Sequence, residues 1–112
     1  SVATHLYVGF RYNNTMAENY NVFANESIAQ RRLKSYAMAF SREKESQYVM
    51  DLIDRDAHLV LDLLENGGVI MICGSLAMQN DVETLLEQLL FANQYQPLAI
   101  YKQRGQLLTD CY

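Results

Sequence analysis

Apolar residues along the chain fall into short continuous runs separated by longer segments of helical spacing. The runs at 5–10, 34–41 and 69–72 are rich in strand-forming residues and predict three strands. The third run is apolar at every position, which is typical of a parallel strand covered on both faces. Beyond Pro97, residues 98–112 could form a strand or a helix followed by a strand, and the pattern favours a short helical piece and a closing strand.

Helical spacing is clearest in two segments. Between 46 and 65, apolar residues recur at intervals near 3.6 residues, and the Asp-Arg-Asp sequence at 54–56 is a candidate break that would give two helices. The Asn-Gly-Gly sequence at 66–68 predicts the left-handed stop that ends many helices. The second segment runs over 76–93. Its predicted inner stripe comprises Val82, Leu85, Leu86, Leu89 and Leu90.

The pattern between the first two strands is weaker. Residues 16–20 predict a polar connection, and residues 20–32 predict a short helix. The apolar positions assigned to this helix and its end are Val22, Phe23, Ile28 and Leu33. Because strands alternate with helices along the whole chain, we expect an α/β fold with a parallel sheet and right-handed crossovers.

Composition narrows the class of function. With 112 residues, half of them hydrophobic, the chain makes one domain, and a net charge of -4 with nine Lys and Arg argues against broad nucleic-acid binding. No apolar run is long enough to cross a bilayer, and no signal sequence opens the chain. Two sparse cysteines suggest reduced thiols in a cytoplasmic domain, and no His or Cys residues have metal-ligand spacing.

The best candidate for chemistry is the turn at Cys73 and Gly74, which leads from the run at 69–72 into a helix. Open α/β folds bind nucleotides at such a junction. A lone cysteine is also commonly a small buried apolar residue. A nucleophilic thiol would need a base, and neither His5 nor His58 has an obvious position for that role.

A second candidate site follows the run at 34–41. The hydroxyl of Ser41 and the guanidinium of Arg42 can together grip a phosphate, although a helix cap and a surface cation would look the same in sequence. Tyr48 offers a ring that can stack on a base, or else the first core aromatic of the next helix.

Five segments in order are Leu-Tyr-Val-Gly-Phe-Arg at 6–11, Ala-Phe-Ser-Arg-Glu at 39–43, Tyr-Val at 48–49, the run at 69–82, and Asp-Cys-Tyr at 110–112. Together they resemble the C-terminal part of the NADP-binding domain of ferredoxin-NADP reductase-like flavoproteins. The diflavin branch, with the sulfite reductase flavoprotein and microsomal cytochrome reductases, is the most similar. This resemblance covers nearly the whole chain and implies a three-layer Rossmann-like parallel sheet.

The resemblance implies roles for the residues at the adenosine end of the cofactor. In that family the Ser-Arg pair binds the 2′-phosphate of NADP and the Tyr stacks on adenine, which assigns Ser41, Arg42 and Tyr48. Arg11 could reach the pyrophosphate, or equally be an ordinary cation after a strand. Met50 stands where the family has Gln, and the loop before Tyr48 is shorter and lacks the family's Lys, so the expected preference for NADP over NAD is weaker.

Other roles concern the nicotinamide. Residues 73–82 match the family pattern as Cys-Gly-x-x-x-Met-x-x-Asp-Val, with one residue fewer before the Met than in the family, so Cys73 would hold the reactive carbon in place and Gly74 would let the cofactor approach. Met78 and Asp81 complete that pattern, and the Asp contacts the ribose or adenine side. At the chain end the resemblance places Asp110 near the nicotinamide and makes Tyr112 the ring that covers the flavin.

The implied function is the NADP(H)-binding portion of an oxidoreductase that passes hydride from NADPH to FAD and electrons on to an acceptor. Its implied partners are the FAD-binding domain of a parent chain and that acceptor. Residues 1–112 would form a partial NADP-binding domain, without the family's first strand, Gly-rich loop and FAD domain. The missing strand would leave an unpaired edge inside the sheet, which predicts a homodimer. The alternative is a catalytically silent α/β module that binds a nucleotide or a protein.

Overall fold

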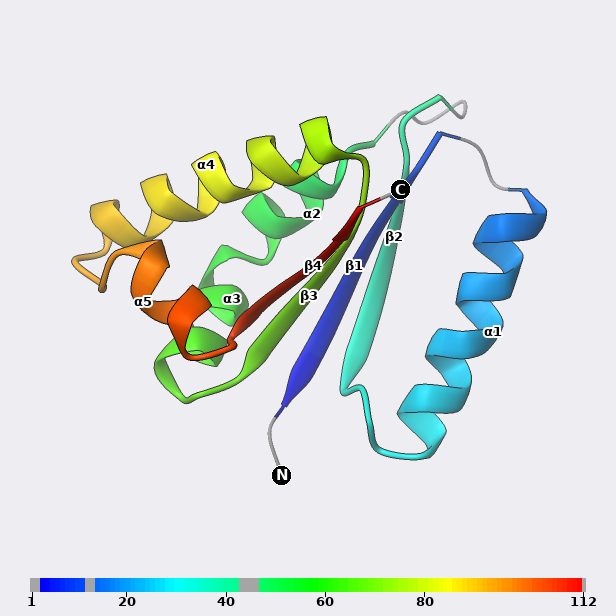
Figure 1. The fold of residues 1–112 in the computed structure, drawn as a ribbon, viewed down its shortest axis with the longest axis horizontal. Coiled ribbons are helices and arrows are strands. Elements are labelled where there is room, and N and C mark those ends of the chain that lie inside the picture. The colour runs from blue at the N-terminus through cyan, green and yellow to red at the C-terminus, as the bar shows by residue number, and fades with distance from the viewer. Residues whose placement is uncertain (1–2, 12–13, 43–46, 112) are drawn as a thin grey trace.

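Four parallel strands form one sheet in the order β2-β1-β3-β4, as Figure 1 shows. The strands are β1 (Thr4–Phe10), β2 (Ser35–Phe40), β3 (Val69–Gly74) and β4 (Leu107–Cys111). The helices are α1 (Thr15–Ala29), α2 (Val49–Arg55), α3 (Ala57–Glu65), α4 (Leu76–Ala92) and α5 (Leu98–Gln103). This computed structural model describes residues 3–11, 14–42 and 47–111, without the side chains of Met16, Asp110 and Cys111.

Helices cover both faces of the sheet. Helix α1 lies alone on one face, and α2, α3, α4 and α5 lie on the other (Figure 1). Successive side chains of β1 point to opposite faces, so Tyr7 packs in the core under α2 to α5 while Leu6 and Val8 pack in the core under α1. The predicted α/β fold with a parallel sheet is therefore confirmed.

The prediction of a short helix over 20–32 was wrong in its bounds, since α1 covers Thr15–Ala29. The helix begins at Thr15, because the side chain of Asn14 caps it by accepting a hydrogen bond of 3.2 Å from the backbone N–H of Ala17. Val22 and Phe23, two of the apolar positions that indicated this helix, are 57% and 53% exposed. Small residues face the sheet instead. They are Ala17, Ala24 and Ser27.

The other helices follow the sequence pattern closely. Asp56 separates α2 from α3, as the Asp-Arg-Asp sequence predicted. Gly67, at φ +80°, ends α3, and the N–H of Gly68 donates to the carbonyl of Leu63 at 2.7 Å, which closes a Schellman motif. The stripe predicted on α4 also faces inward. Val82, Leu86 and Leu90 are buried, and Leu85 and Leu89 pack against them.

The described strands leave no gap inside the sheet, so the expected unpaired edge is not found among them. Strand β1 pairs directly with β3 from Thr4↔Val69 to Val8↔Cys73, and with β2 on its other side. Backbone groups of β1 thus find hydrogen-bonding partners on both sides within this chain. The homodimer was predicted from an unpaired strand edge inside the sheet. Without that edge the argument for it is lost, and the homodimer stays a prediction.

Candidate functional site

A cleft of about 640 Å³ opens at the carboxyl ends of the strands. The chain leaves β1 toward α1 on one face of the sheet and leaves β3 toward α4 on the other (Figure 1). Neighbouring strands whose connections diverge in this way form a switch point, where open α/β sheets bind their ligands. The volume lies in the range of small-molecule sites.

Six of the residues predicted to bind a cofactor line this cleft. They come from the ends of two strands and from two helices that are far apart in sequence. They are Arg11, Ser41, Tyr48, Met50, Met78 and Asp81. The tertiary structure thus brings most of the adenosine-end candidates to one place.

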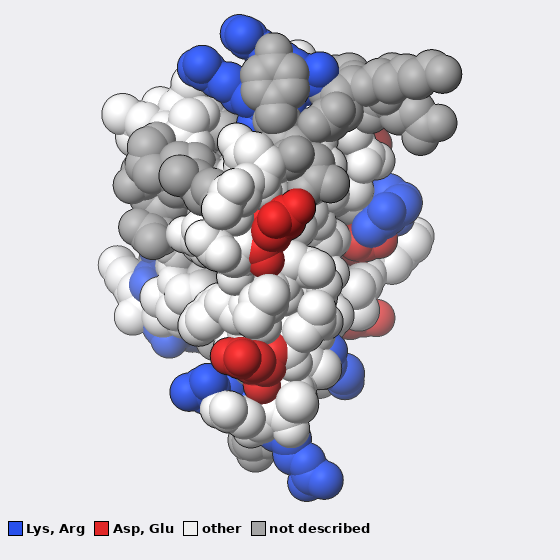
Figure 2. All heavy atoms as spheres, turned by 90° about the vertical axis from the view of Figure 1, so that its right-hand side faces the viewer, with Lys and Arg blue, Asp and Glu red and all other residues white. Residues whose placement is uncertain are grey.

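The ends of β1 and β2 lie side by side at the rim of the cleft. The backbone N–H of Ser41 donates to the carbonyl of Phe10 at 2.9 Å, and the N–H of Arg42 donates to the carbonyl of Arg11 at 2.9 Å. Figure 2 shows Lys and Arg side chains gathered at this upper end of the molecule. Among the described residues, the guanidinium groups of Arg11 and Arg42 have no ion-pair partner. Arg42 is exposed beside the cleft and does not line it.

The beginning of α1 adds to the positive potential at this rim. Asn14, its capping residue, also lines the cleft, and α1 extends over 15 residues. The N-terminus of such a helix carries a partial positive charge and free N–H groups. Together with Arg11 and Ser41, it makes the β1–β2 side of the cleft suited to an anion.

Tyr48 presents its ring at the cleft wall. The side chain is 54% exposed although it belongs to the residue that begins α2. Its backbone N–H donates to a carboxylate oxygen of Asp51 at 2.9 Å, which fixes the backbone at the start of the helix. The alternative role as a core aromatic is therefore excluded, and the ring is available for stacking.

Met78 fills the space between the ends of β1 and β3. A Cβ atom added to Gly74 would overlap the terminal methyl of Met78, and one added to Gly9 would lie 3.5 Å from the same methyl. Gly74 therefore makes room for Met78, whereas a Cβ atom at Gly9 would lie closest to Val49, at 3.1 Å. The close approach that the resemblance assigns to a cofactor at Gly74 is taken by Met78 in this structure.

Cys73 lies on the other side of the sheet. It is 4% exposed and packs in the core under α1 with Leu6, Val8 and Phe10. It does not line the cleft. Asp110 is its register partner on β4, but the side chain of Asp110 and all of Tyr112 lie outside the described residues.

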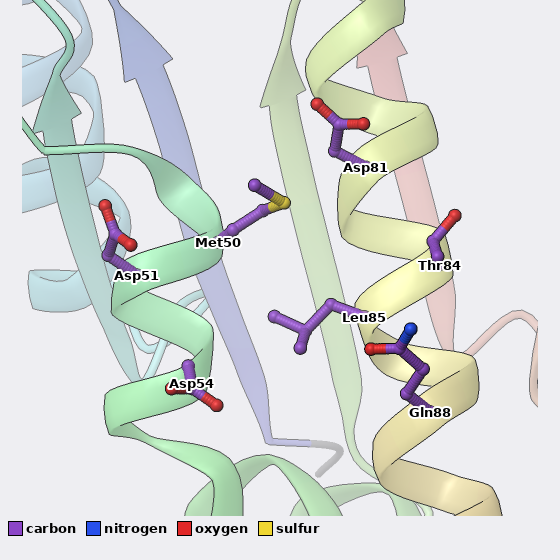
Figure 3. A pocket seen from close by; sticks show the side chains of 7 residues that line it. All are labelled: Met50, Asp51, Asp54, Asp81, Thr84, Leu85 and Gln88. Atoms are coloured by element: carbon purple, nitrogen blue, oxygen red, sulfur yellow. The ribbon is translucent and has the colours of Figure 1, made fainter.

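A narrower groove of about 370 Å³ adjoins the cleft and runs between α2 and α4 (Figure 3). Met50 and Leu85 point into it from the two helices, and Met50 and Asp81 line both hollows. Asp51, Asp54 and Asp81 give this groove a negative character. The cleft is therefore polarised, with cations toward β2 and carboxylates toward the groove.

A polar cluster that the sequence did not reveal lies away from the cleft. Tyr7, 3% exposed, donates a hydrogen bond of 3.0 Å to Oδ2 of Asp56, and Arg55 donates to both carboxylate oxygens at 3.0 Å. The ring of His5, buried on β1, is hydrogen-bonded to the hydroxyl of Ser35. No sequence signal could have found this set, because its members are ordinary strand and turn residues.

The local environment shifts the acid–base behaviour of this cluster. Hydrogen bonding by Arg55 holds the pKa of Asp56 below its usual value. Burial raises the pKa of Tyr7, and its hydrogen bond to Asp56 raises it further, so the hydroxyl keeps its proton and donates. Burial, and then the charge of Lys34, lowers the pKa of His5.

These features define an α/β domain with an all-parallel sheet and a polarised cleft at its switch point. No protein-family model matches the chain, and no curated protein matches it either. Within the described residues, no helix is long and apolar enough to span a membrane. Nor do three His, Cys, Asp or Glu side chains in this part of the chain come together as metal ligands.

Proposed function

We propose that the chain binds NADP(H) in the cleft, as the nucleotide-binding portion of an FAD-dependent oxidoreductase of the ferredoxin-NADP reductase type. The observation that carries this proposal is the convergence of Arg11, Ser41 and Tyr48 at the switch point of a parallel sheet. A phosphate needs cations and N–H donors, and a base needs a flat ring. The cleft offers both within one hollow.

The charge distribution gives the nucleotide a direction. Its 2′-phosphate lies at the β2 side near Ser41 and Arg42, and its adenine stacks on Tyr48. Asp81 and the acidic groove beside it repel phosphate, which favours the same orientation. The rest of the dinucleotide then extends across the end of β1 toward β3 and β4.

The redox step depends on groups that this cleft does not itself supply. When bound, FAD accepts hydride from the reduced nicotinamide; the residues of this chain bind and orient the nucleotide. Asp110 keeps its predicted role beside the nicotinamide, since its backbone pairs with Cys73 at the strand ends. Cys73, buried under α1, would act on the nicotinamide site only through the packing of β3.

Isothermal titration of NADP⁺, NAD⁺ and 2′,5′-ADP into the chain tests the proposal. We expect NADP⁺ and 2′,5′-ADP to bind, and NAD⁺ to bind more weakly, because only the first two carry the 2′-phosphate. Absence of binding by all three would remove the nucleotide function. Equal binding of NADP⁺ and NAD⁺ would keep the nucleotide site and remove the phosphate assignment.

A second function, a nucleotide-binding module without catalysis, is favoured by the position of Cys73. Its thiol belongs to the core under α1 and not to the cleft lining. Flavin reduction by NADPH in a parent protein that contains the flavin domain separates the two functions, because a module without catalysis shows none. Cys73→Ala then tests the thiol. A fall in the rate with unchanged NADPH affinity would assign Cys73 to the nicotinamide step, and an unchanged rate would leave it a structural role only.

A further inference from the structure

We infer that Met78 is a displaceable plug over a second subsite of the cleft, at the ends of β1 and β3, and that a dinucleotide must move it in order to bind in full. This inference rests on the proposed function and names what regulates access to the site. The geometry begins with the two glycines. Gly9 and Gly74 lack side chains where their strands end, and the methyl of Met78 occupies the space of a Cβ atom at Gly74 and borders, together with Val49, the space above Gly9.

The attachment of Met78 explains how it can move without unfolding anything. It lies in the first turn of α4, where its backbone N–H donates to the hydroxyl of Ser75 at 3.1 Å. The backbone is therefore fixed while the side chain, which is only half-buried, rotates about three bonds. A thioether is polarisable and flexible, so it fills an irregular gap at low cost and leaves it at low cost.

Strand order places this subsite beyond the phosphate end of the cleft. Ser41 and Arg42 follow β2, Gly9 lies near the end of β1, and Gly74 ends β3, so the subsite begins one strand away from the 2′-phosphate position and extends to two strands away. Adjacent strands are separated by about 4.8 Å, which puts Gly74, where the methyl of Met78 lies closest, about 10 Å from the 2′-phosphate position. A mononucleotide held at β2 need not reach Met78, whereas the pyrophosphate and nicotinamide of a dinucleotide must pass it.

The consequence is a difference between short and long ligands. If the subsite is open in only a fraction of molecules, the apparent affinity for a ligand that needs it falls by that fraction. Removing the side chain of Met78 should recover the lost affinity for NADP⁺ and leave the affinity for 2′,5′-ADP unchanged. Met50 provides a matched control, because it is also a half-buried methionine that lines the cleft but lies over neither glycine.

The experiment compares NADP⁺ and 2′,5′-ADP binding by the original chain, Met78→Ala and Met50→Ala. We expect Met78→Ala to bind NADP⁺ about fivefold more tightly, with 2′,5′-ADP affinity unchanged. Met50→Ala should give no such gain. Equal gains for both ligands, or weaker NADP⁺ binding by Met78→Ala, would overturn the plug while leaving the nucleotide site intact. If neither ligand binds any of the three proteins, the proposed function fails and the plug with it.

A measurement without the alanine variant guards against misfolding. In the original chain labelled with ¹³C-methyl methionine, the Met78 signal is assigned by its loss in Met78→Leu. Saturating NADP⁺ should shift this signal strongly, and saturating 2′,5′-ADP should shift it little. A Met78 signal that responds equally to both ligands contradicts the inference.

Discussion

The two ends of β1 both carry polar side chains, but they use them differently. Toward the start of the strand, His5 bonds to Ser35 and Tyr7 bonds to Asp56, so the donors and acceptors are paired within the fold. Beyond its end, Arg11 stands at the rim of an open cleft, next to the exposed Arg42.

This contrast separates stability from recognition. A buried polar group adds to stability only when it is paired, and truncating its partner leaves a costly unsatisfied group. A solvated guanidinium at a cleft rim adds little to folding and keeps its hydrogen-bonding capacity for a ligand. Substitutions in the polar cluster should therefore change unfolding, and substitutions at the rim should change binding.

The largest effect is expected for Asp56→Ala. It removes the acceptor of the buried Tyr7 hydroxyl, which should lower the free energy of unfolding by about 2 kcal/mol. Urea denaturation followed by circular dichroism measures this loss. Asp54→Ala is the matched control, because Asp54 is an exposed carboxylate near the end of α2, two residues before Asp56, and it should change stability little. Equal losses of stability in the two variants would show that the hydrogen bond between Asp56 and Tyr7 does not stabilise the fold.

Arg42→Ala should have the next largest effect, and on binding alone. Loss of a charged hydrogen bond to the 2′-phosphate should weaken the binding of NADP⁺ about tenfold and leave the binding of NAD⁺ unchanged. Arg32→Ala, at an exposed position in the turn after α1, is the control. Calorimetric titration measures both affinities. A similar loss for NADP⁺ and NAD⁺ would remove Arg42 from the phosphate site.

Tyr48→Ala should weaken all adenine nucleotides about fivefold, since stacking of a base on a ring contributes about 1 kcal/mol. Tyr48→Phe keeps the ring and should bind like the original chain. Fluorescence titration with 2′,5′-ADP distinguishes the two variants. If Tyr48→Phe binds as weakly as Tyr48→Ala, the hydroxyl and not the ring makes the contact.

The smallest effect is a pH dependence due to His5. Because burial lowers its pKa in the folded state, the unfolded state binds more protons, and stability rises with pH in this range. The contribution of His5 is complete above its usual value of 6.5 and decreases as the pH falls below it. Thermal melting at pH 5.5 and 7.5 should differ less in His5→Gln than in the original chain. His58→Gln, at an exposed position on α3, should leave the difference unchanged.

The prediction of α1 shows where a local pattern misleads. Large apolar residues such as Phe23 indicated the helix, yet Phe23 is exposed and Ala17 and Ala24 are buried. A helix that packs closely on a sheet can favour small side chains in the contact. The distance between helix and sheet cannot be predicted from hydrophobic periodicity. The stripe on α4 was predicted correctly because leucines at regular spacing leave no alternative face.

The sequence by itself determined the alternation of strands and helices, the break at Asp56, the stop at Gly67 and the residue types at the strand ends, because these depend on neighbours along the chain. Only the tertiary structure decided that β1 pairs with β3, which closed the expected gap in the sheet. It also put Cys73 under α1 and Met78 over Gly74. Strand order and the face to which a side chain points follow from long-range pairing, and no local pattern encodes them.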